Sequence, residues 1–363
     1  MTTSRADVSV EPMKKHLAFG VVVLLLAGSS LAHSASPTAL DVENIHKAAA
    51  NAKSLFLGEA GRIQAVDTFM RLVRIKGPSG LEQPVREELL RILTQAGAAA
   101  VSTKTNDPAA PCNLIMEIPG SGDLAGRPGI LLNAHTDTIE RSTPEFVAFD
   151  DRTGDFYHQH ESDSQKSSSF GGDDRSAVAV IVEAVRLLQA NQWARGVAHR
   201  RILLVFTAEE EQGLLGAKYL SLHEPALFAS LEISLSIDGP LDFRSNYPRD
   251  SFVAVVSESD SVIMPYKHVL ELMQEFCGRS GTRFGRTEIG LGMGDFSCFP
   301  ASAHAGLHLR SPVRGFHRTE RLNVQDLINH IDLLCYLLLG WDHSPPANIS
   351  PQTSAGGTDE KSR

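Results

Sequence analysis

The sequence has no excess of positive charge and little cysteine. It carries 34 Lys and Arg against 43 Asp and Glu, so its formal net charge is −9 at pH 7. That balance offers no basic face, and a nucleic-acid partner is not expected. The cysteines lack the Cys-x-x-Cys spacing of a zinc knuckle. In an exported protein, four cysteines allow three complete sets of disulfide pairs, which the sequence does not rank. The alternative is that they are plain core residues. They are Cys112, Cys277, Cys298 and Cys335.

An apolar run long enough to cross a bilayer is also missing near the N-terminus. The run from Leu17 to Ala27 is too short to span comfortably. It follows Met13-Lys14-Lys15 and precedes Ser30-Leu31-Ala32, which is the order of a secretory signal. We therefore expect residues 1–35 to be a signal peptide with an N-terminal extension, translation to start at Met13, and the mature protein to be periplasmic or secreted and free of the membrane.

The far end of the chain has a different composition. Residues 343–363 are rich in Pro, Ser, Thr and Gly, which predicts a disordered tail. Residues 41–342 remain for the folded part, and 42% hydrophobic with 21% charged residues is ordinary for a globular protein.

Strands and helices alternate along this central part. Amphipathic helices are predicted at 66–75 and 79–97, and Ser79-Gly-Leu-Glu82 has the form of a capping box at the start of the second. Residues 140–169 are predicted to be a polar loop. Apolar strands are predicted near 113–118, 130–133, 202–206, 231–237, 252–256 and 305–309, and further helices near 178–188, 214–222, 269–276 and 327–338. This alternation indicates an α/β fold.

Acids and a histidine follow several of these strands. His135 and Asp137 end one strand, the triplet Glu209-Glu210-Glu211 ends another, and Asp238 ends a third. Open α/β sheets hold ligands at the edge where parallel strands end, so these side chains should meet there. Singly, each has an ordinary explanation: a solvated charge run for the Glu triplet, or a helix N-cap for Asp173 and Asp174.

Together these residues predict a metal centre. Five positions at element ends, separated by whole secondary structures, are His135, Asp174, Glu211, Asp238 and His317. Imidazole suits zinc and cobalt, and carboxylates bridge pairs of ions about 3.5–4 Å apart in hydrolytic sites. We expect two divalent ions per chain, zinc in the first place and cobalt or manganese as alternatives.

The motifs from Val66 to Leu339 resemble those of the co-catalytic zinc exopeptidases. The nearest likeness is to the peptidase T, carboxypeptidase G and acetylornithine deacetylase family, with a second to the leucyl-type zinc aminopeptidases. The resemblance implies a ligand at His135 with Asp137 as its supporting acid. The family's Gly-x-Asp-Asp-Lys segment is similar to Gly172-Asp173-Asp174-Arg175, and it implies that Asp174 bridges the ions.

The remaining roles follow from the same resemblance. The Glu-Glu-x-Gly motif implies that Glu210 is the general base and Glu211 a ligand. One ion would then be held by His135, Asp174 and Asp238, and the other by Asp174, Glu211 and His317.

One departure from the family pattern concerns domain organisation. Relatives with a lid insert a dimerisation domain of about a hundred residues before the last His, but only 79 positions separate Asp238 from His317 here. We therefore expect a monomer with a single-domain, three-layer α/β/α sandwich around a mixed, mostly parallel sheet.

The expected activity is hydrolysis of a peptide bond in a small peptide. Because the lid of the relatives helps to hold a substrate carboxylate, its loss favours an aminopeptidase. A dipeptidase or carboxypeptidase, for which Arg310 and Arg314 would bind the carboxylate, and a deacylase of N-acyl amino acids are the alternatives. A glutaminyl cyclase-like acyltransferase and a non-catalytic binding relative are less favoured, because the chain keeps every implied position.

Overall fold

The structure is a computed structural model that describes residues 40–101, 110–140, 142–159, 169–240, 251–256, 263–289, 294–299, 306–314 and 320–341. The chain divides into two units, Met1–Ser36 and Pro37–Arg363, and all described residues belong to the second. The predicted signal, residues 1–35, and the predicted tail, residues 343–363, lie outside the described residues. Their boundaries stay predictions.

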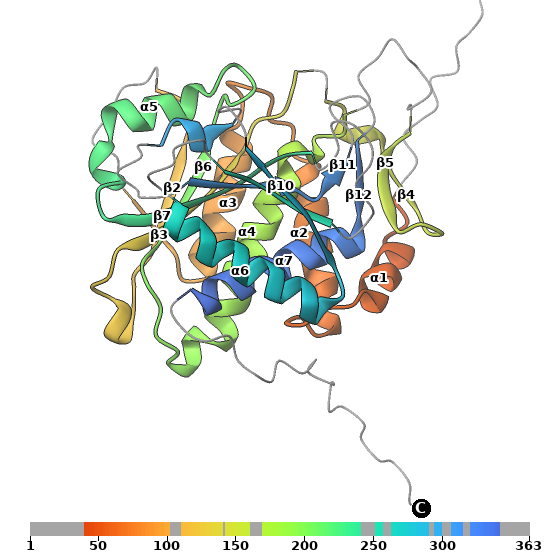
Figure 1. The fold of residues 1–363 in the computed structure, drawn as a ribbon. Coiled ribbons are helices and arrows are strands. Elements are labelled where there is room, and N and C mark those ends of the chain that lie inside the picture. Colours follow the sequence, from red (N-terminus) through yellow and green to blue (C-terminus); the bar gives the residue numbers. More distant parts are fainter. Residues whose placement is uncertain are drawn as a thin grey trace, which may run out of the picture. The chain divides into compact units, whose positions relative to one another are not determined.

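An eight-stranded mixed sheet carries the fold, with strand order β1-β2-β6-β3-β7-β10-β8-β9 (Figure 1). Its centre is parallel and consists of β6 (Ile202–Thr207), β3 (Gly129–His135), β7 (Leu231–Pro240) and β10 (Gly306–Ser311). The strands that flank this centre are partly antiparallel. On one side β2 (Leu114–Ile118) runs antiparallel to β6, and β1 (Ala99–Ala100) runs antiparallel to β2. On the other side β8 (Ser251–Val256) runs antiparallel to β10, and β9 (Arg283–Ile289) runs parallel to β8. Because β3, β6 and β7 are parallel, their last residues meet at one edge.

The central strands are apolar on both faces. In β6, Ile202, Leu204 and Phe206 belong to the larger core cluster, whereas Leu203 and Val205 belong to the smaller one. Side chains alternate across a strand, and a strand that is buried on both faces therefore has a continuous apolar sequence.

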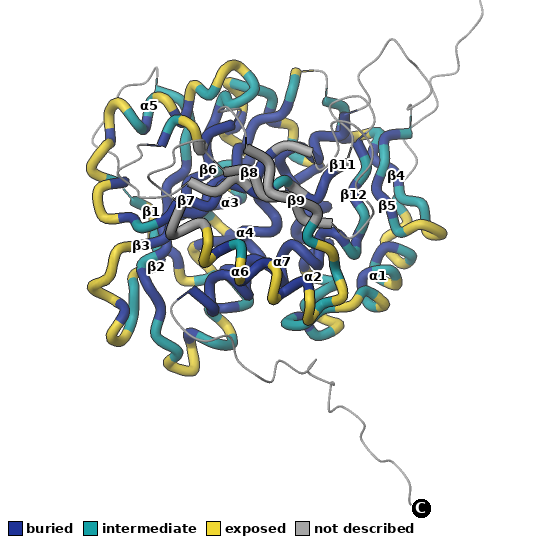
Figure 2. The backbone as a smooth tube through the Cα atoms, in the orientation of Figure 1, coloured by how far each residue is buried: buried dark blue, intermediate teal, exposed yellow. Residues whose placement is uncertain are grey.

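Helices cover the two faces unequally (Figures 1 and 2). The larger core cluster includes residues of α1 (Val42–Asn51), α2 (Glu59–Val73), α3 (Gln83–Gln95), α4 (Gly172–Asn191), α6 (Ile263–Ser280) and α7 (Val324–Gly340). On the other face, α5 (Leu215–His223) contributes Ala217 and Leu220 to the smaller cluster. The three-layer, single-domain α/β/α prediction is confirmed, and the described strands β8, β9 and β10 after Asp238 all join the same sheet.

Helix α4 is the central helix of this arrangement. Its residues from Gly172 to Val185 are buried on every side, as expected for a helix whose sequence, such as Ala177 to Val182, is apolar all round. It begins at the sheet edge where β3, β6 and β7 end, and it packs against α2, α7, β3 and β7.

A second, antiparallel sheet was not expected from the sequence. It has the order β11-β12-β5-β4, with β4 (Val147–Asp150), β5 (Asp155–His158), β11 (Val313–Arg314) and β12 (Arg321–Asn323). The prediction of a loop throughout 140–169 is wrong for β4 and β5. Phe156 is fully buried there, with its ring centroid 5.2 Å from that of Phe69 of α2, so apolar packing organises a segment whose overall composition is polar.

Short 3₁₀ turns complete the described structure. They are η1 (Gly122–Leu124), η2 (Pro144–Phe146), η3 (Trp193–Arg195), η4 (Pro225–Leu227) and η6 (Asp295–Ser297). All four cysteines are free thiols, and Cys277 and Cys335 are buried in α6 and α7. In the described part of the chain, no helix is both long and apolar enough to cross a membrane.

Candidate metal centre

His135, the last residue of β3, lies at the middle of a cluster of acids. Its side chain is almost fully buried, and its Nε2 atom faces carboxylate oxygens from three other segments. The distances are 3.5 Å to Asp238, 3.6 Å to Asp173 and 3.9 Å to Glu210. The ends of β3, β6 and β7 and the start of α4 therefore meet around one imidazole.

Asp137 fixes the other side of that imidazole. Its Oδ1 atom lies 3.2 Å from Nδ1 of His135 and accepts the main-chain N–H of Glu210 at 3.0 Å. Its Oδ2 atom accepts the hydroxyl of Ser79 at 2.7 Å and the N–H of Glu211 at 3.0 Å. Burial raises the pKa of Asp137, but the hydrogen bond and charge of His135 outweigh it and leave the pKa below its usual value. The predicted supporting role of Asp137 agrees with this geometry.

The glutamate triplet follows β6 in a tight turn. Glu209 has a φ of 55°, in the left-handed region, and its N–H donates to Oε1 of Glu82 at 3.0 Å. The next two N–H groups are those held by Asp137. Glu210 and Glu211 thus keep their carboxylates near His135, and one ligand atom of each lies within 4.8 Å of the others.

The two adjacent aspartates at the start of α4 face different partners. Their backbone is not helical, with φ and ψ of −85° and 108° at Asp173 and −116° and 26° at Asp174. Asp173 groups with His135 and Asp238 as a possible set of ligands, again within 4.8 Å. Asp174 instead accepts the main-chain N–H of His135 at 3.3 Å, and its buried Oδ1 has no hydrogen-bond partner among the described residues.

The structure thus brings together most of the predicted site. His135, Asp137, Glu210, Glu211 and Asp238 lie in one cluster. The geometry favours Asp173 for the bridging place predicted for Asp174, which lies behind the His135 main chain. His317 lies outside the described residues, so its role as a ligand stays a prediction.

Too many acids share this space for all of them to ionise without added positive charge. The pKa of Glu210 is raised to about 9: burial is the largest cause, Asp238, Asp295 and Glu211 add to it, and His135 opposes it. Burial likewise holds the pKa of Asp174 well above its usual value. Burial lowers the pKa of His135, but Glu210 and the other carboxylates more than reverse this and leave it raised. Divalent cations would replace such protons, and imidazole with carboxylates suits zinc, so the residues present fit a metal centre.

Two features of the site were missed from the sequence. Asp295 of η6 is buried and accepts hydrogen bonds from Thr207 and, at 3.4 Å, from Asn133; burial is the main cause that raises its pKa to about 7. The signal that could have found it is the glycine-rich sequence Gly290-Leu-Gly-Met-Gly294 directly before it. The predicted capping box is also wrong: α3 begins at Gln83 without a side-chain cap, because Ser79 and Glu82 reach Asp137 and Glu209 instead.

Comparison with known proteins places the chain among peptidases. A model of peptidase family M28 matches residues 113–333. None of the curated proteins matches the chain. The fold is similar to that of aminopeptidase PepT from Bacillus cereus, with 15% identity over 77% of this chain and 98% of that one, and a TM-score of 0.58.

Two further solved structures share the fold. A tripeptidase from Staphylococcus aureus is 16% identical over 76% of this chain and 97% of its own, with a TM-score of 0.57. The LapA aminopeptidase of Legionella pneumophila is 14% identical over 90% of this chain and 79% of its own, with a TM-score of 0.51. At such identities the likeness establishes the fold. The expected likeness to the co-catalytic zinc exopeptidases is confirmed.

The pair Asp173 and Asp174 gives a test of which carboxylate holds metal. Asp173→Asn removes a charged oxygen 3.6 Å from His135 and should abolish tight binding of both ions. Asp174→Asn keeps an acceptor for the His135 N–H and should cost no more than the roughly 10–100-fold in affinity typical of an outer residue. Metal content after dialysis against a chelator, with thermal unfolding as the control for folding, separates the two. The opposite ranking would return the bridge to Asp174.

Proposed function

The chain belongs to peptidase family M28, and from that premise we propose that it is a two-metal aminopeptidase, which removes residues from the free N-terminus of small peptides. The observation that carries the proposal is the imidazole of His135, surrounded within 3.9 Å by carboxylates from three segments. That donor set suits zinc, which the family uses as a pair of ions.

The residues divide between the two ions as follows. His135, Asp173 and Asp238 would hold one ion, and Asp173, Glu211 and His317 the other. The assignment of Asp173 rests on its place beside His135 and Asp238, and that of His317 on the family resemblance. Bound there, the ions supply Lewis-acid polarisation of the scissile carbonyl and acidify the attacking water.

Glu210 is the proposed general base. Its carboxylate lies at the edge of the cluster, 3.9 Å from Nε2 of His135, and its main chain is held by Asp137. Burial raises its pKa in the protein alone, which supports this role, because nearby cations would bring that pKa down toward the working range of a base. Glu210 takes the proton of the attacking water and passes it to the leaving amine.

The excess of acid also favours a substrate with a free amine. The causes that shift the pKa of Glu210 and Asp295 are burial, neighbouring acids, His135 and two neutral hydrogen-bond donors. A substrate ammonium group would be stabilised in such surroundings, whereas a substrate carboxylate would be repelled. The carboxypeptidase alternative depends on Arg310 of β10 and Arg314 of β11, and it becomes an outcome of the experiment below.

The proposal predicts a strict need for the free amine. Zinc-loaded protein should hydrolyse aminoacyl-4-nitroanilides, and N-acetylation of the same compounds should lower kcat/KM by roughly 10–150-fold or more, the loss of one hydrogen bond to a charged group. The control panel contains N-acetyl dipeptides with a free carboxylate and N-acyl amino acids. Preferred cleavage of the former would indicate a carboxypeptidase, and of the latter a deacylase; either would overturn the aminopeptidase assignment.

We also propose that the protein is exported and acts as a monomer, on the strength of the Lys14-Lys15 and Leu17 to Ala27 pattern and the short interval between Asp238 and His317. The intact mass of protein recovered from the producing cells should correspond to a chain without the residues up to about Ala35. Light scattering should give the mass of one chain. A chain that still begins at Met1 would refute export, and a dimer would refute the second part.

A further inference from the structure

Arg175 is a buried cation beneath the metal centre that the proposed mechanism does not use. It directly follows the Asp173-Asp174 pair on α4, and its exposed fraction is 0%. Few groups are more costly to bury than a guanidinium, so its partners decide what it does.

The guanidinium binds two main-chain carbonyls rather than an acid. Nη1 donates to the carbonyl of Thr136, and Nη2 donates to that of Ile75 at 3.5 Å. Thr136 lies between His135 and Asp137, and its own N–H donates to Thr207 of β6 at 2.7 Å. The peptide groups on both sides of Thr136 are therefore fixed, which sets the positions from which His135 and Asp137 reach each other.

Arg175 also places charge among the buried acids. Burial lowers the pKa of its guanidinium, and the nearby carboxylates of Asp137, Glu82 and Asp174 oppose that effect. One cation thus lies near three acids, and two of them, Asp137 and Glu82, organise the β3 and β6 ends through hydrogen bonds.

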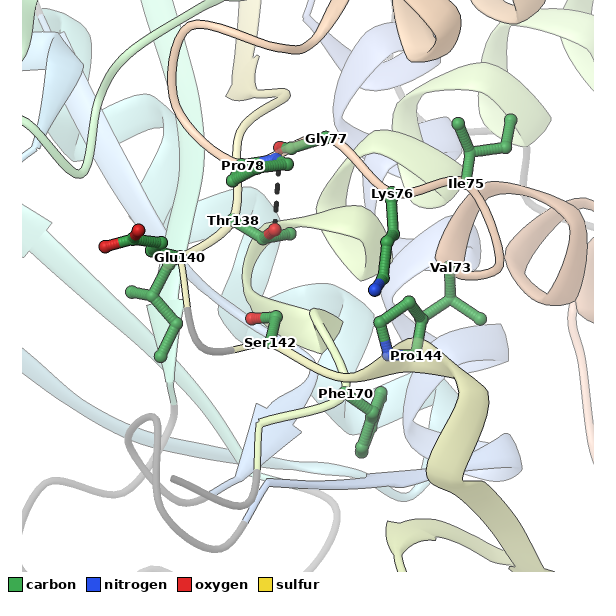
Figure 3. Close-up of a pocket in the computed structure, with 11 residues that line it drawn as sticks. Val73, Ile75, Lys76, Gly77, Pro78, Thr138, Glu140, Ser142, Pro144 and Phe170 are labelled. Carbon is green, nitrogen blue, oxygen red and sulfur yellow. Dashed lines mark hydrogen bonds between the residues drawn. The ribbon is translucent and has the colours of Figure 1, made fainter. Parts of the chain in front are cut away.

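Gly77 makes the space for the guanidinium. A Cβ atom at residue 77 would lie 2.7 Å from Nη2 of Arg175 and 3.0 Å from Cγ2 of Val85, both too close. Gly77 also lines a cavity of about 120 Å³ (Figure 3), but the nearest atoms that its missing Cβ would meet belong to Arg175 and Val85. Its φ is outside the left-handed region, so backbone conformation does not require glycine here.

The same loop is attached to the site on its other side. The N–H of Thr138, the residue after Asp137, donates to the carbonyl of Gly77 at 3.0 Å, and the Thr138 hydroxyl donates to the same carbonyl at 3.5 Å (Figure 3). Two residues further along the loop, Ser79 donates to Asp137. Arg175 thus lies at the junction of the α2–α3 loop, the end of β3 and the start of α4.

We propose that Arg175 is a positioning residue of the metal centre, which holds the His135–Asp137 segment through the Thr136 carbonyl, and that Gly77 is glycine because the guanidinium occupies the place of its side chain. The inference rests on the proposed function only in that the centre binds metal. It does not depend on which peptide bond is cleaved.

The first experiment compares Arg175→Met and Arg175→Lys with a control on the same helix, Arg186→Met, which breaks an ion pair with Glu183 away from the centre. Zinc affinity is measured by competition with a chromophoric chelator, and the folded fraction by thermal unfolding. We expect Arg175→Met to weaken zinc binding by about 10–100-fold, Arg175→Lys to restore part of it, and Arg186→Met to leave it unchanged. Folded Arg175→Met with the zinc affinity of the native chain would overturn the proposal.

A second experiment tests the proposal without Arg175→Met, so it can be done even if that variant does not fold. Gly77→Ala should lower the Tm by several degrees in the native chain and by much less in the Arg175→Lys background, because the slender ammonium head can move away from the added methyl. An equal fall in Tm in both backgrounds would show that glycine is needed at residue 77 for a reason other than Arg175, and it would refute the proposed pairing of the two residues. Both readouts work without a substrate, so failure of the aminopeptidase assignment leaves them intact.

Discussion

The carboxylate of Asp137 is the group on which the rest of the site depends. It meets the imidazole of His135, the hydroxyl of Ser79 and two successive N–H groups of the glutamate turn. These partners come from β3, the loop before α3 and the turn after β6, so one buried acid sets the mutual position of three segments. Buried networks of this kind are rigid when every member is satisfied, and costly when one is lost.

A second constraint is the number of acids in a small space. Asp173, Glu210 and Asp238 surround one imidazole, with Asp174 and Asp295 behind them. Burial first, and repulsion between the acids second, raise the pKa values of Glu210 and Asp174, so that without cations the cluster holds protons. Metal ions in place of those protons would link metal binding to the stability of the folded chain. Arg175 adds a buried positive charge near Asp137, Glu82 and Asp174.

The sequence allowed the ligand-binding edge of the sheet to be predicted, because three apolar strands lead into acids or a histidine. Ile202 to Phe206 precedes Glu210, and the two other strands lead into His135 and Asp238. It did not distinguish Asp173 from Asp174, since which of two adjacent acids faces the metal depends on non-helical torsions within the start of α4. Ser79 and Glu82 have the spacing of a capping box, but their partners, Asp137 and Glu209, are distant in sequence. Strands β4 and β5 were missed for a similar reason, because the packing of Phe156 on Phe69 is a long-range contact.

The central claim is that Asp137, by holding the N–H groups of both Glu210 and Glu211, gives two adjacent glutamates separate tasks. The most direct test measures zinc content and kcat side by side for Glu210→Gln and Glu211→Gln. The account predicts that Glu210→Gln retains two zinc ions and loses about 10²–10⁴-fold in kcat, the usual cost of a missing general base. Glu211→Gln should instead lose zinc and recover part of its activity in excess metal. Exchanged phenotypes would move the base to Glu209 and contradict the account, and two fully active variants would contradict the hydrolytic mechanism itself.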